Sequence, residues 1–393
     1  MSAEQNRHSP RAPAGFEAIP APLHHASTVV FPDVAALRAR QWQQHEVYTY
    51  GLMGTPTTVE LQRKLCEIEQ ARYCLLAPSG LAAISMTDLA LLQVGDVVAI
   101  PDNAYAPNRE LAHGLLTRLG IDYWVYDPMR PVVFPERTRL VWLEAPGSVT
   151  LEMPDLPALI QAAKAVGAWT AIDNTWSAGL AYQPFSHGID ISLQALTKYQ
   201  SGGADVLMGA VMTQDHDLHL KLKYAHMRLG LGVGADDAWL VLRGLPTLRL
   251  RYEQHDRVTR ALAQWMKTLP VFEQVLHPAL PDSPGHEYWQ RDFSAAGGLV
   301  SVVFPGEVGQ TRVDAFVDAL QVFRIGYSWG GPVSLALPYD PATLRRHGAW
   351  QPGQSLVRFC IGLEPFEDLR ADIEQALEST GLNRFSPPLR SGT

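Results

Sequence analysis

The sequence has few cysteines and no long apolar run, and these absences exclude several classes of protein. Only three cysteines occur in 393 residues, and no two form a CxxC pair, so structural disulfides and a thiolate zinc site are not expected. No run of about 18 apolar residues is present, so no membrane span is predicted. The N-terminus, MSAEQNRHSPRAPAG, lacks the apolar core of a signal peptide. We therefore expect a soluble, cytoplasmic protein.

Positive charge is also scarce. The 32 lysines and arginines are outnumbered by 40 aspartates and glutamates, which gives a formal net charge of −8. No Lys/Arg block is present, so a nucleic-acid surface is not predicted. The 13 histidines contain no HExxH pair, and no metal site is predicted. The glycine-rich run 230–234, GLGVG, follows a helical segment, whereas a dinucleotide-binding fingerprint follows a strand, so none is predicted there.

Apolar residues, by contrast, are abundant. They make up 47% of the chain, enough for two domains or for one large domain with an appendage. Short apolar runs alternate with helical patterns, and the runs are apolar throughout, which is typical of strands covered on both faces. This alternation predicts an α/β fold with a mainly parallel sheet. The predicted strands cover residues 73–77, 96–100, 122–126, 139–144, 169–173 and 191–196.

The two ends of the chain have a different pattern. Residues 1–15 are expected to be a disordered or arm-like segment, followed by an irregular stretch with one short helix over 33–44. Asp236 and Asp237 predict the N-cap of a long helical region. Beyond about residue 270, three further strands (298–304, 334–338 and 355–364) and two helices indicate a smaller α+β domain. The predicted division is 1–54, 55–248 and 249–393.

Four predicted strand ends carry residues suited to chemistry, because functional groups gather at the carboxyl ends of parallel strands. Small residues at Ser79 and Gly80 leave backbone N–H groups free for an anion, or form an ordinary turn. Tyr105 could stack on a planar ligand or pack under a helix. Asp173 ends a buried strand and needs a partner, which could be a metal, a helix N-terminus or a cation. Lys198 either reaches solvent or has a lowered pKa.

The four features together indicate one kind of ligand, although each alone has an ordinary structural explanation. An anion cradle, an aromatic plate, a carboxylate and a lysine occur at successive strand ends, in this order along the chain. Pyridoxal phosphate (PLP) needs these parts: a lysine for its aldehyde, an acid for its ring nitrogen and a cradle for its phosphate. The sequence therefore predicts a PLP site.

The motifs are familiar as a set. They resemble the Cys/Met-metabolism family of fold-type-I PLP enzymes, from about Pro22 to Leu377. The resemblance implies a mainly parallel seven-stranded sheet with helices on both faces and a smaller C-terminal α+β domain. It rests on YTYGLMGTPTTVELQRKLCEIEQ (48–70), PSGLAA (78–83), DNAYAPN (102–108), LEAPGS (143–148), IDNTWSAG (172–179), ALTKY (195–199), YSWGG (327–331) and SLVRFCIGLE (355–364).

The resemblance also implies roles for single residues. Lys198 corresponds to the lysine that bonds to the cofactor, Asp173 to the partner of the ring nitrogen, and Tyr105 to the tyrosine stacked on the ring. Arg358 corresponds to the arginine that binds the substrate α-carboxylate, a bidentate task that suits its planar guanidinium. The residues that correspond to the phosphate cradle are Gly80, Leu81 and Thr197. Those that correspond to the substrate pocket are Tyr327, Ser328 and Trp329.

Tyr50 corresponds to a tyrosine that similar enzymes contribute to a neighbouring subunit's site, so the resemblance implies a homo-oligomer, a dimer of dimers. Relatives often have an arginine two residues further on, which reaches the neighbouring phosphate. This chain has Leu52 there, so that cation is missing. Loss of a charge-assisted hydrogen bond costs about 1.5–3 kcal/mol, which predicts weaker cofactor retention unless another cation substitutes.

Two positions bear on the reaction that the resemblance implies. Relatives that act at Cγ tend to have a glutamate where this chain has Tyr327, and many relatives have asparagine in place of Ser148. Both features resemble the branch that cleaves carbon–sulfur bonds at Cβ and releases a thiol, pyruvate and ammonia. The alternatives are a γ-acting member of the family and a PLP-binding regulatory protein with residual catalysis.

Overall fold

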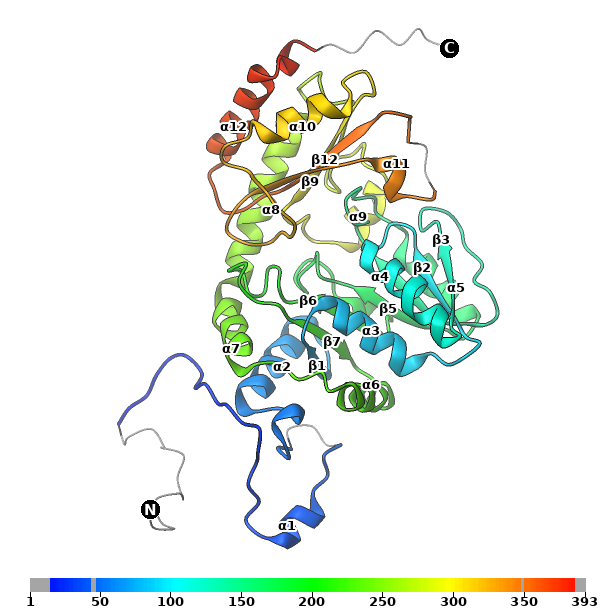
Figure 1. Cartoon of the computed structure of the whole chain (residues 1–393), viewed down its shortest axis with the longest axis vertical. Coiled ribbons are helices and arrows are strands. Elements are labelled where there is room, and N and C mark those ends of the chain that lie inside the picture. Colours follow the sequence, from blue (N-terminus) through cyan, green and yellow to red (C-terminus); the bar gives the residue numbers. More distant parts are fainter. Residues whose placement is uncertain (1–14, 44–46, 348–349, 386–393) are drawn as a thin grey trace.

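The computed structural model describes residues 15–43, 47–347 and 350–385. It contains two sheets that lie one above the other in Figure 1, joined by the long helix α8. The strands of the larger sheet are β1 (Tyr73–Ala77), β2 (Val97–Pro101), β3 (Asp122–Tyr126), β4 (Thr138–Glu144), β5 (Trp169–Asp173), β6 (Ile191–Ala195) and β7 (Gly209–Thr213). Those of the smaller sheet are β8 (Gln274–Leu276), β9 (Leu299–Phe304), β10 (Arg324–Ile325), β11 (Leu335–Tyr339) and β12 (Ser355–Cys360).

The larger sheet is mainly parallel, with strand order β1-β7-β6-β5-β4-β2-β3. Only β7 runs antiparallel to its two neighbours. β1, β2 and β7 are buried along their whole length, which explains why their residues are apolar throughout. The predicted fold class is confirmed. β7 is missing from the predicted strands, because the run Gly209–Thr213 begins with a glycine, which weakens a strand pattern.

Helices cover both faces of this sheet. Apolar side chains of α3 and α6 pack on one face, and those of α2, α5, α7 and α8 pack on the other. The helices of the described chain are α1 (Val34–Ala39), α2 (Pro56–Glu69), α3 (Gly80–Leu91), α4 (Ala106–Leu111), α5 (Leu156–Ala165), α6 (His216–Leu229), α7 (Ala235–Gly244), α8 (Leu248–Met266), α9 (His286–Asp292), α10 (Gln310–Asp318), α11 (Pro341–Leu344) and α12 (Phe366–Ser379).

The helical region around residue 240 differs from the prediction. The N-cap of α7 is Gly234, and Asp236 and Asp237 lie in its first turn, where their charges favour the helix dipole. The region is also divided into α7 and α8 by a 3-10 turn that contains Pro246, because proline lacks the N–H that an α-helix interior needs.

The smaller sheet has strand order β10-β11-β12-β9-β8. α8, α10 and α12 cover one of its faces and enclose a core with Phe304, Phe316 and Phe359. The C-terminal region is therefore α+β, as expected. The exact domain boundaries at residues 54 and 248 stay a prediction.

The segment before α2 extends away from both sheets (the blue part of Figure 1). α1 has no buried residue, and it is shorter than the predicted helix over 33–44. The arm expected over residues 1–15 lies outside the described residues except for Gly15. Within the described chain, no helix is both long and apolar enough to cross a membrane.

Candidate functional site

Lys198 lies in the turn after β6 and faces the smaller sheet. Its Nζ donates a hydrogen bond to Ser328 Oγ at 2.9 Å and lies 5.5 Å from the centre of the Trp329 ring. Burial and the nearby Arg358 guanidinium lower the pKa of the Lys198 amine. A lysine with a lowered pKa spends more of its time neutral, and a neutral amine can attack a carbonyl carbon.

The turn after Lys198 is held firmly. The Tyr199 ring is fully buried, and its hydroxyl accepts a hydrogen bond from Gly298 N–H at 2.7 Å. Arg251 Nη1 donates to the carbonyl of Tyr199 at 2.6 Å. The position of the amine is thus fixed by contacts with α8 and with the segment that leads into β9.

Asp173 is the last residue of β5, the neighbour of β6 in the sheet. Its carboxylate accepts hydrogen bonds from the backbone N–H of Thr175, at 3.0 Å, and from the Thr175 hydroxyl. Burial raises the pKa of Asp173, while the Thr175 hydrogen bonds and the charge of Lys198 oppose that shift. The Thr175 hydroxyl in turn accepts from Ala195 N–H at 2.8 Å, which ties the end of β5 to the end of β6.

Tyr105 follows β2 and is 44% exposed. Its backbone N–H donates to Glu144 Oε2 at 2.7 Å, and Glu144 lies beside Asp173 in the register of β4 and β5. Burial, Asp173 and Glu144 all raise the pKa of the Tyr105 hydroxyl, so the chain alone keeps it protonated. Our sequence reasoning missed Glu144, although it ends a predicted strand as Asp173 does and the same rule would have identified it.

The start of α3 matches the anion cradle expected there. Ser79 caps the helix by accepting a hydrogen bond from Ala82 N–H at 3.0 Å. A Cβ on Gly80 would lie 2.9 Å from the Cβ of Ala195, so only glycine lets the helix start approach the end of β6 this closely. Thr197 lies nearby, and its hydroxyl contacts the backbone of Met208. No described residue accepts a hydrogen bond from the N–H groups of Gly80 or Leu81.

Arg358 comes from β12 of the smaller sheet and is 6% exposed. Its guanidinium lies 5.6 Å from the centre of the Tyr339 ring. Its Nε has no hydrogen-bond partner, and no carboxylate of the described residues pairs with it. A buried cation without an anion is costly, so this arrangement suits an anionic ligand such as an amino-acid carboxylate.

Cys360, two residues further along β12, is a second residue that our sequence reasoning did not single out. Strand alternation puts it on the same face as Arg358. Its thiol donates a hydrogen bond to the carbonyl of Ser328 at 3.2 Å. Ser328 has a φ of 102°, a backbone conformation that residues other than glycine rarely adopt. Cys360 therefore helps to hold the residue that contacts Lys198. No sequence signal marks such a role.

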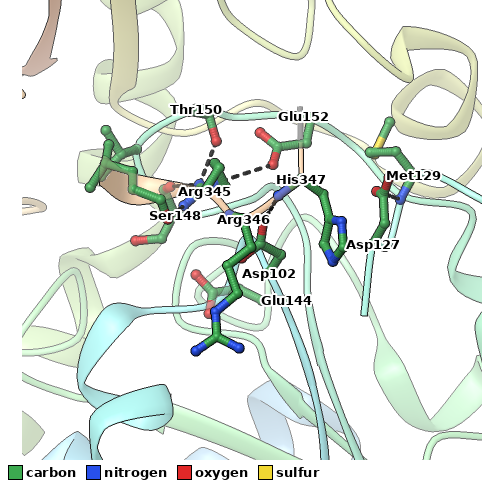
Figure 2. A network of polar contacts seen from close by, with 12 residues as sticks. Asp102, Asp127, Met129, Glu144, Ser148, Thr150, Glu152, Arg345, Arg346 and His347 are labelled. Carbon is green, nitrogen blue, oxygen red and sulfur yellow. Dashed lines mark hydrogen bonds and ion pairs between the residues drawn. The ribbon is translucent and has the colours of Figure 1, made fainter. Parts of the chain in front are cut away.

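The segment after β11 joins the smaller sheet to this edge (Figure 2). The carboxylate of Asp102, just after β2, accepts from the backbone N–H groups of Arg346 and His347, each at 2.7 Å, and pairs with Arg109 at 2.9 Å. Arg345 donates to the carbonyl of Ser148 and to the Thr150 hydroxyl, and lies 3.5 Å from Glu152.

Two predicted site residues are not enclosed by these contacts. Tyr50 is 53% exposed and forms a β-bridge with Thr28 in the segment that extends from the body. Tyr327 is 83% exposed, although it precedes Ser328. Leu52, where relatives often have arginine, lies near Gly232. The chain thus brings Lys198, Asp173, Tyr105, Arg358, Ser328 and Trp329 around one edge and leaves Tyr50 outside it.

Comparisons with known proteins fit this geometry. The family model described as "Cys/Met metabolism PLP-dependent enzyme" matches residues 4–378. The chain belongs to this family. It is 42% identical to cystathionine beta-lyase of Bordetella avium, over 91% of both chains, and 40% identical to a putative cystathionine beta-lyase of Rhizobium johnstonii, over 90% of both. It is similar in structure to cystathionine gamma synthase of Xanthomonas oryzae, with TM-score 0.83, 30% identity and coverage of 94% and 95%.

Membership in the Cys/Met metabolism family makes PLP the cofactor, and the site fits it. The free N–H groups at the start of α3 suit a phosphate, since a helix N-terminus attracts anions. Asp173, whose charge is favoured by Thr175, suits a protonated ring nitrogen. Lys198, with its lowered pKa, suits the aldehyde.

Proposed function

We propose that this chain is a carbon–sulfur β-lyase that cleaves L-cystathionine to homocysteine, pyruvate and ammonia. The observation that carries the proposal is the buried Arg358, which has no anionic partner among the residues that the structure describes and whose charge acts on the amine of Lys198. This pair suits a substrate with an α-carboxylate and an α-amine. Relatives named cystathionine beta-lyase, at 42% and 40% identity, support the choice of thioether and of cleavage at Cβ.

Arg358 binds and orients the substrate. Its planar guanidinium holds the α-carboxylate through charge-assisted hydrogen bonds, and this fixes the direction of the Cα–H bond. Ser328 and Trp329 form the wall beside Lys198 Nζ and exclude water from one side of the amine. The exposed Tyr327 is suited to meet the distal part of the substrate.

Bound PLP supplies an aldehyde for the substrate amine and a protonated ring that accepts the electrons left at Cα. Lys198 removes the Cα proton, which its lowered pKa permits. Asp173, whose charge the Thr175 hydrogen bonds favour, would hold the proton on the ring nitrogen of the bound cofactor. Lys198 then gives its proton to the thiolate that leaves Cβ, and hydrolysis yields pyruvate and ammonia. The base for the incoming amine is Tyr50 or Tyr105; because the chain alone keeps the Tyr105 hydroxyl protonated, Tyr105 takes this proton only where the bound cofactor lowers the pKa of that hydroxyl.

The complete site is formed by a homo-oligomer, a dimer of dimers. Tyr50 is exposed in a segment with several exposed apolar side chains, among them Phe16, Ile19, Val30 and Val34. A second copy of the chain would cover these side chains and receive Tyr50. The cytoplasm stays the expected location.

A γ-acting function is the second candidate, because the structural similarity to a cystathionine gamma synthase is also high. The two reactions give different keto acids from cystathionine. Cleavage at Cβ gives pyruvate, whereas cleavage at Cγ gives 2-oxobutyrate. We expect pyruvate in stoichiometric amounts with homocysteine, and release slower by about 10⁴-fold from Lys198→Ala. Release of 2-oxobutyrate alone would refute the proposal.

The same assay extends to the substrate range. Cystine and S-alkyl cysteines have the same Cα and Cβ as cystathionine, so Arg358 and Lys198 can act on them in the same way. S-alkyl cysteines lack the distal amino-acid group that cystathionine and cystine both have, so their rates relative to these two substrates measure how much that group contributes. Equal kcat/KM values for all of them would mean that this group is not recognised.

A further inference from the structure

Glu69 is a buried acid that the proposed reaction does not use. It is the last residue of α2 and is 0% exposed. No basic side chain of the described residues pairs with it. Burial raises the pKa of its carboxyl to about 7, against hydrogen bonds that lower it. Burying a carboxyl without a cationic partner costs folding free energy, so we expect Glu69 to have a structural or functional role.

The hydrogen bonds to Glu69 come from two neighbouring strands. Asn174 Nδ2 lies 2.9 Å from Oε1 and 3.2 Å from Oε2. Ser192 Oγ donates to Oε1 at 3.2 Å, and Gln194 Nε2 donates to the same oxygen. Gln200 Nε2 in turn donates to Gln194 Oε1. One carboxyl thus accepts from residues at the end of β5 and along β6.

These side chains are close in sequence to the two residues that would contact the cofactor. Asn174 follows Asp173 directly. Gln194 lies in β6, four residues before Lys198, and Gln200 lies in the turn after β6, two residues after Lys198. The backbone pairing of β5 with β6 ends at Asp173 and Leu193, so it does not reach this turn. Side-chain contacts, from Thr175 to Ala195 and from Asn174 and Gln194 to Glu69, therefore help to set the position of Lys198 relative to Asp173, together with the backbone hydrogen bonds within the turn.

The surrounding residues leave the carboxyl little freedom. A Cβ on Gly179 would lie 3.2 Å from Glu69 Cγ and 3.1 Å from Gln194 Nε2. Gly179 has a φ of 69°, which glycine adopts without strain. The Asn174 side chain is also held, because its Oδ1 accepts from the Ser177 hydroxyl. The contacts to Glu69 therefore form a rigid set.

We propose that Glu69 is a positioning residue that fixes the separation between Asp173 and Lys198. One planar ring must meet Asp173 at its nitrogen and Lys198 at its aldehyde at the same time, so this separation matters for both contacts. The inference rests on the proposed function for the roles of these two residues. Glu69 touches neither substrate nor cofactor and acts through Asn174, Gln194 and Gln200.

The test uses the purified holoenzyme and variants at two buried acids. Glu69→Leu removes the acceptor, and Glu69→Gln retains one acceptor oxygen of the same reach. Asp88→Leu is the matched control, because Asp88 is also 0% exposed, has a pKa raised to about 7 and accepts from Trp142 Nε1 at 2.9 Å. Asp88 lies within α3 and does not bond to the turns of Asp173 or Lys198.

We expect Glu69→Leu to lower kcat by about tenfold to a hundredfold with little change in KM, since small misplacements of reacting groups have effects of this size. The pH at which the absorbance of bound PLP changes should also shift, because that pH depends on the bond at Lys198 and on the charge at Asp173. Glu69→Gln should restore most of both. Asp88→Leu should lower the melting temperature but leave kcat and the absorbance transition unchanged.

Two outcomes would overturn the proposal. One is that Glu69→Leu behaves like Asp88→Leu, with lower thermal stability alone. The other applies if Glu69→Leu does not fold. In that case Asn174→Ala, which breaks the link on the Asp173 side, should shift the pH of the absorbance transition. An unshifted transition in Asn174→Ala would refute the positioning role of Glu69. The absorbance needs no substrate, so this arm is informative even if the wild-type protein releases no pyruvate from cystathionine.

Discussion

Two parts of this chain are expected to contribute to one site, and they differ in burial and in how firmly hydrogen bonds hold their side chains. The edge that carries Glu144, Asp173, Lys198 and Arg358, called the buried edge below, is partly to fully buried, and hydrogen bonds within the chain hold its functional side chains. The segment that carries Tyr50 has an exposed surface, with Tyr50 itself 53% exposed and no buried residue in α1. The chain therefore builds the chemistry of the site itself and leaves part of the enclosure open.

This difference separates two kinds of residue. Lys198 and Arg358 need burial, because burial lowers the pKa of the amine and strengthens the attraction for a carboxylate. In the proposed function Tyr50 needs only to reach the site, and a second copy of the chain would bring it there. Substitutions at the buried edge should thus act within one chain, and those in the exposed segment should act between chains.

The largest effect is expected at Lys198. Lys198→Ala removes both the amine that would bond to the cofactor and the base at Cα, so kcat for pyruvate release should fall by about 10⁴-fold. Steady-state assays with cystathionine measure this. The variant should keep the wild-type melting profile when PLP is absent. Activity near the wild-type level would mean that the buried edge is not the catalytic part.

Arg358 is expected to have the next largest effect. Arg358→Leu removes charge-assisted hydrogen bonds of about 1.5–3 kcal/mol each, so kcat/KM should fall by at least about a hundredfold. Arg358→Lys should recover only part, because an ammonium group cannot make the bidentate contact. KM values for cystathionine and for cystine distinguish this from a fault in the fold. An unchanged KM in Arg358→Leu would contradict a role in substrate binding.

A shared site can be tested by mixing two inactive variants. Lys198→Ala and Tyr50→Ala subunits are denatured together, refolded and assayed. A hybrid dimer would contain one site with both residues intact, so random assembly should restore roughly a quarter of the wild-type activity. Each variant refolded alone is the control. If the mixture stays as inactive as the controls, Tyr50 does not act across a subunit boundary.

A smaller effect is expected at Cys360. Cys360→Ala removes the hydrogen bond to the carbonyl of Ser328, which is worth about 1 kcal/mol, so kcat should fall by about fivefold. Cys360→Ser keeps a donor and should retain more activity.

Tyr327→Phe, in the exposed part of the pocket, should change KM for cystathionine more than kcat. The reverse pattern would contradict the distinction between the buried edge and the open side.

The last prediction concerns the pH dependence of stability, and the substitution should leave activity unchanged. Burial raises the pKa of Asp88 from 3.8 to about 7, so the folded protein keeps a proton that the unfolded chain has released. The free energy of unfolding should therefore fall as pH rises from about 4 through about 7. Asp88→Asn should reduce this decline, as measured by urea denaturation at several pH values. An undiminished decline would mean that Asp88 is not buried as a neutral acid.

Sequence reasoning predicted the larger sheet well, because strands covered on both faces are apolar throughout and end in turns with distinctive residues. It missed β7, where Gly209 begins a short antiparallel strand that has no such turn pattern. It placed the cap of α7 on Asp236 because aspartate favours both the N-cap and the first turn. The local pattern does not separate these two positions.

Sequence reasoning singled out Lys198 and Asp173 because four suggestive strand ends occur in the order of the family motifs, and the structure places both residues at or just after the ends of neighbouring strands, while their roles stay a proposal. Cys360 and Glu69 were not singled out, because their roles depend on contacts with residues far away in the chain. Cys360 bonds to Ser328, 32 positions away, and Glu69 bonds to Asn174, 105 positions away. Spacing along a single sequence does not encode such pairs.

The most direct test of this account is to find which residue PLP labels. Borohydride reduction of the purified holoenzyme makes the bond between the cofactor and its amine permanent, and peptide mass spectrometry then locates the added mass. We predict that the label is on the peptide that contains Lys198 and that Lys198→Ala is unlabelled. A label on another lysine in the wild-type protein would contradict the assignment of the buried edge as the catalytic part.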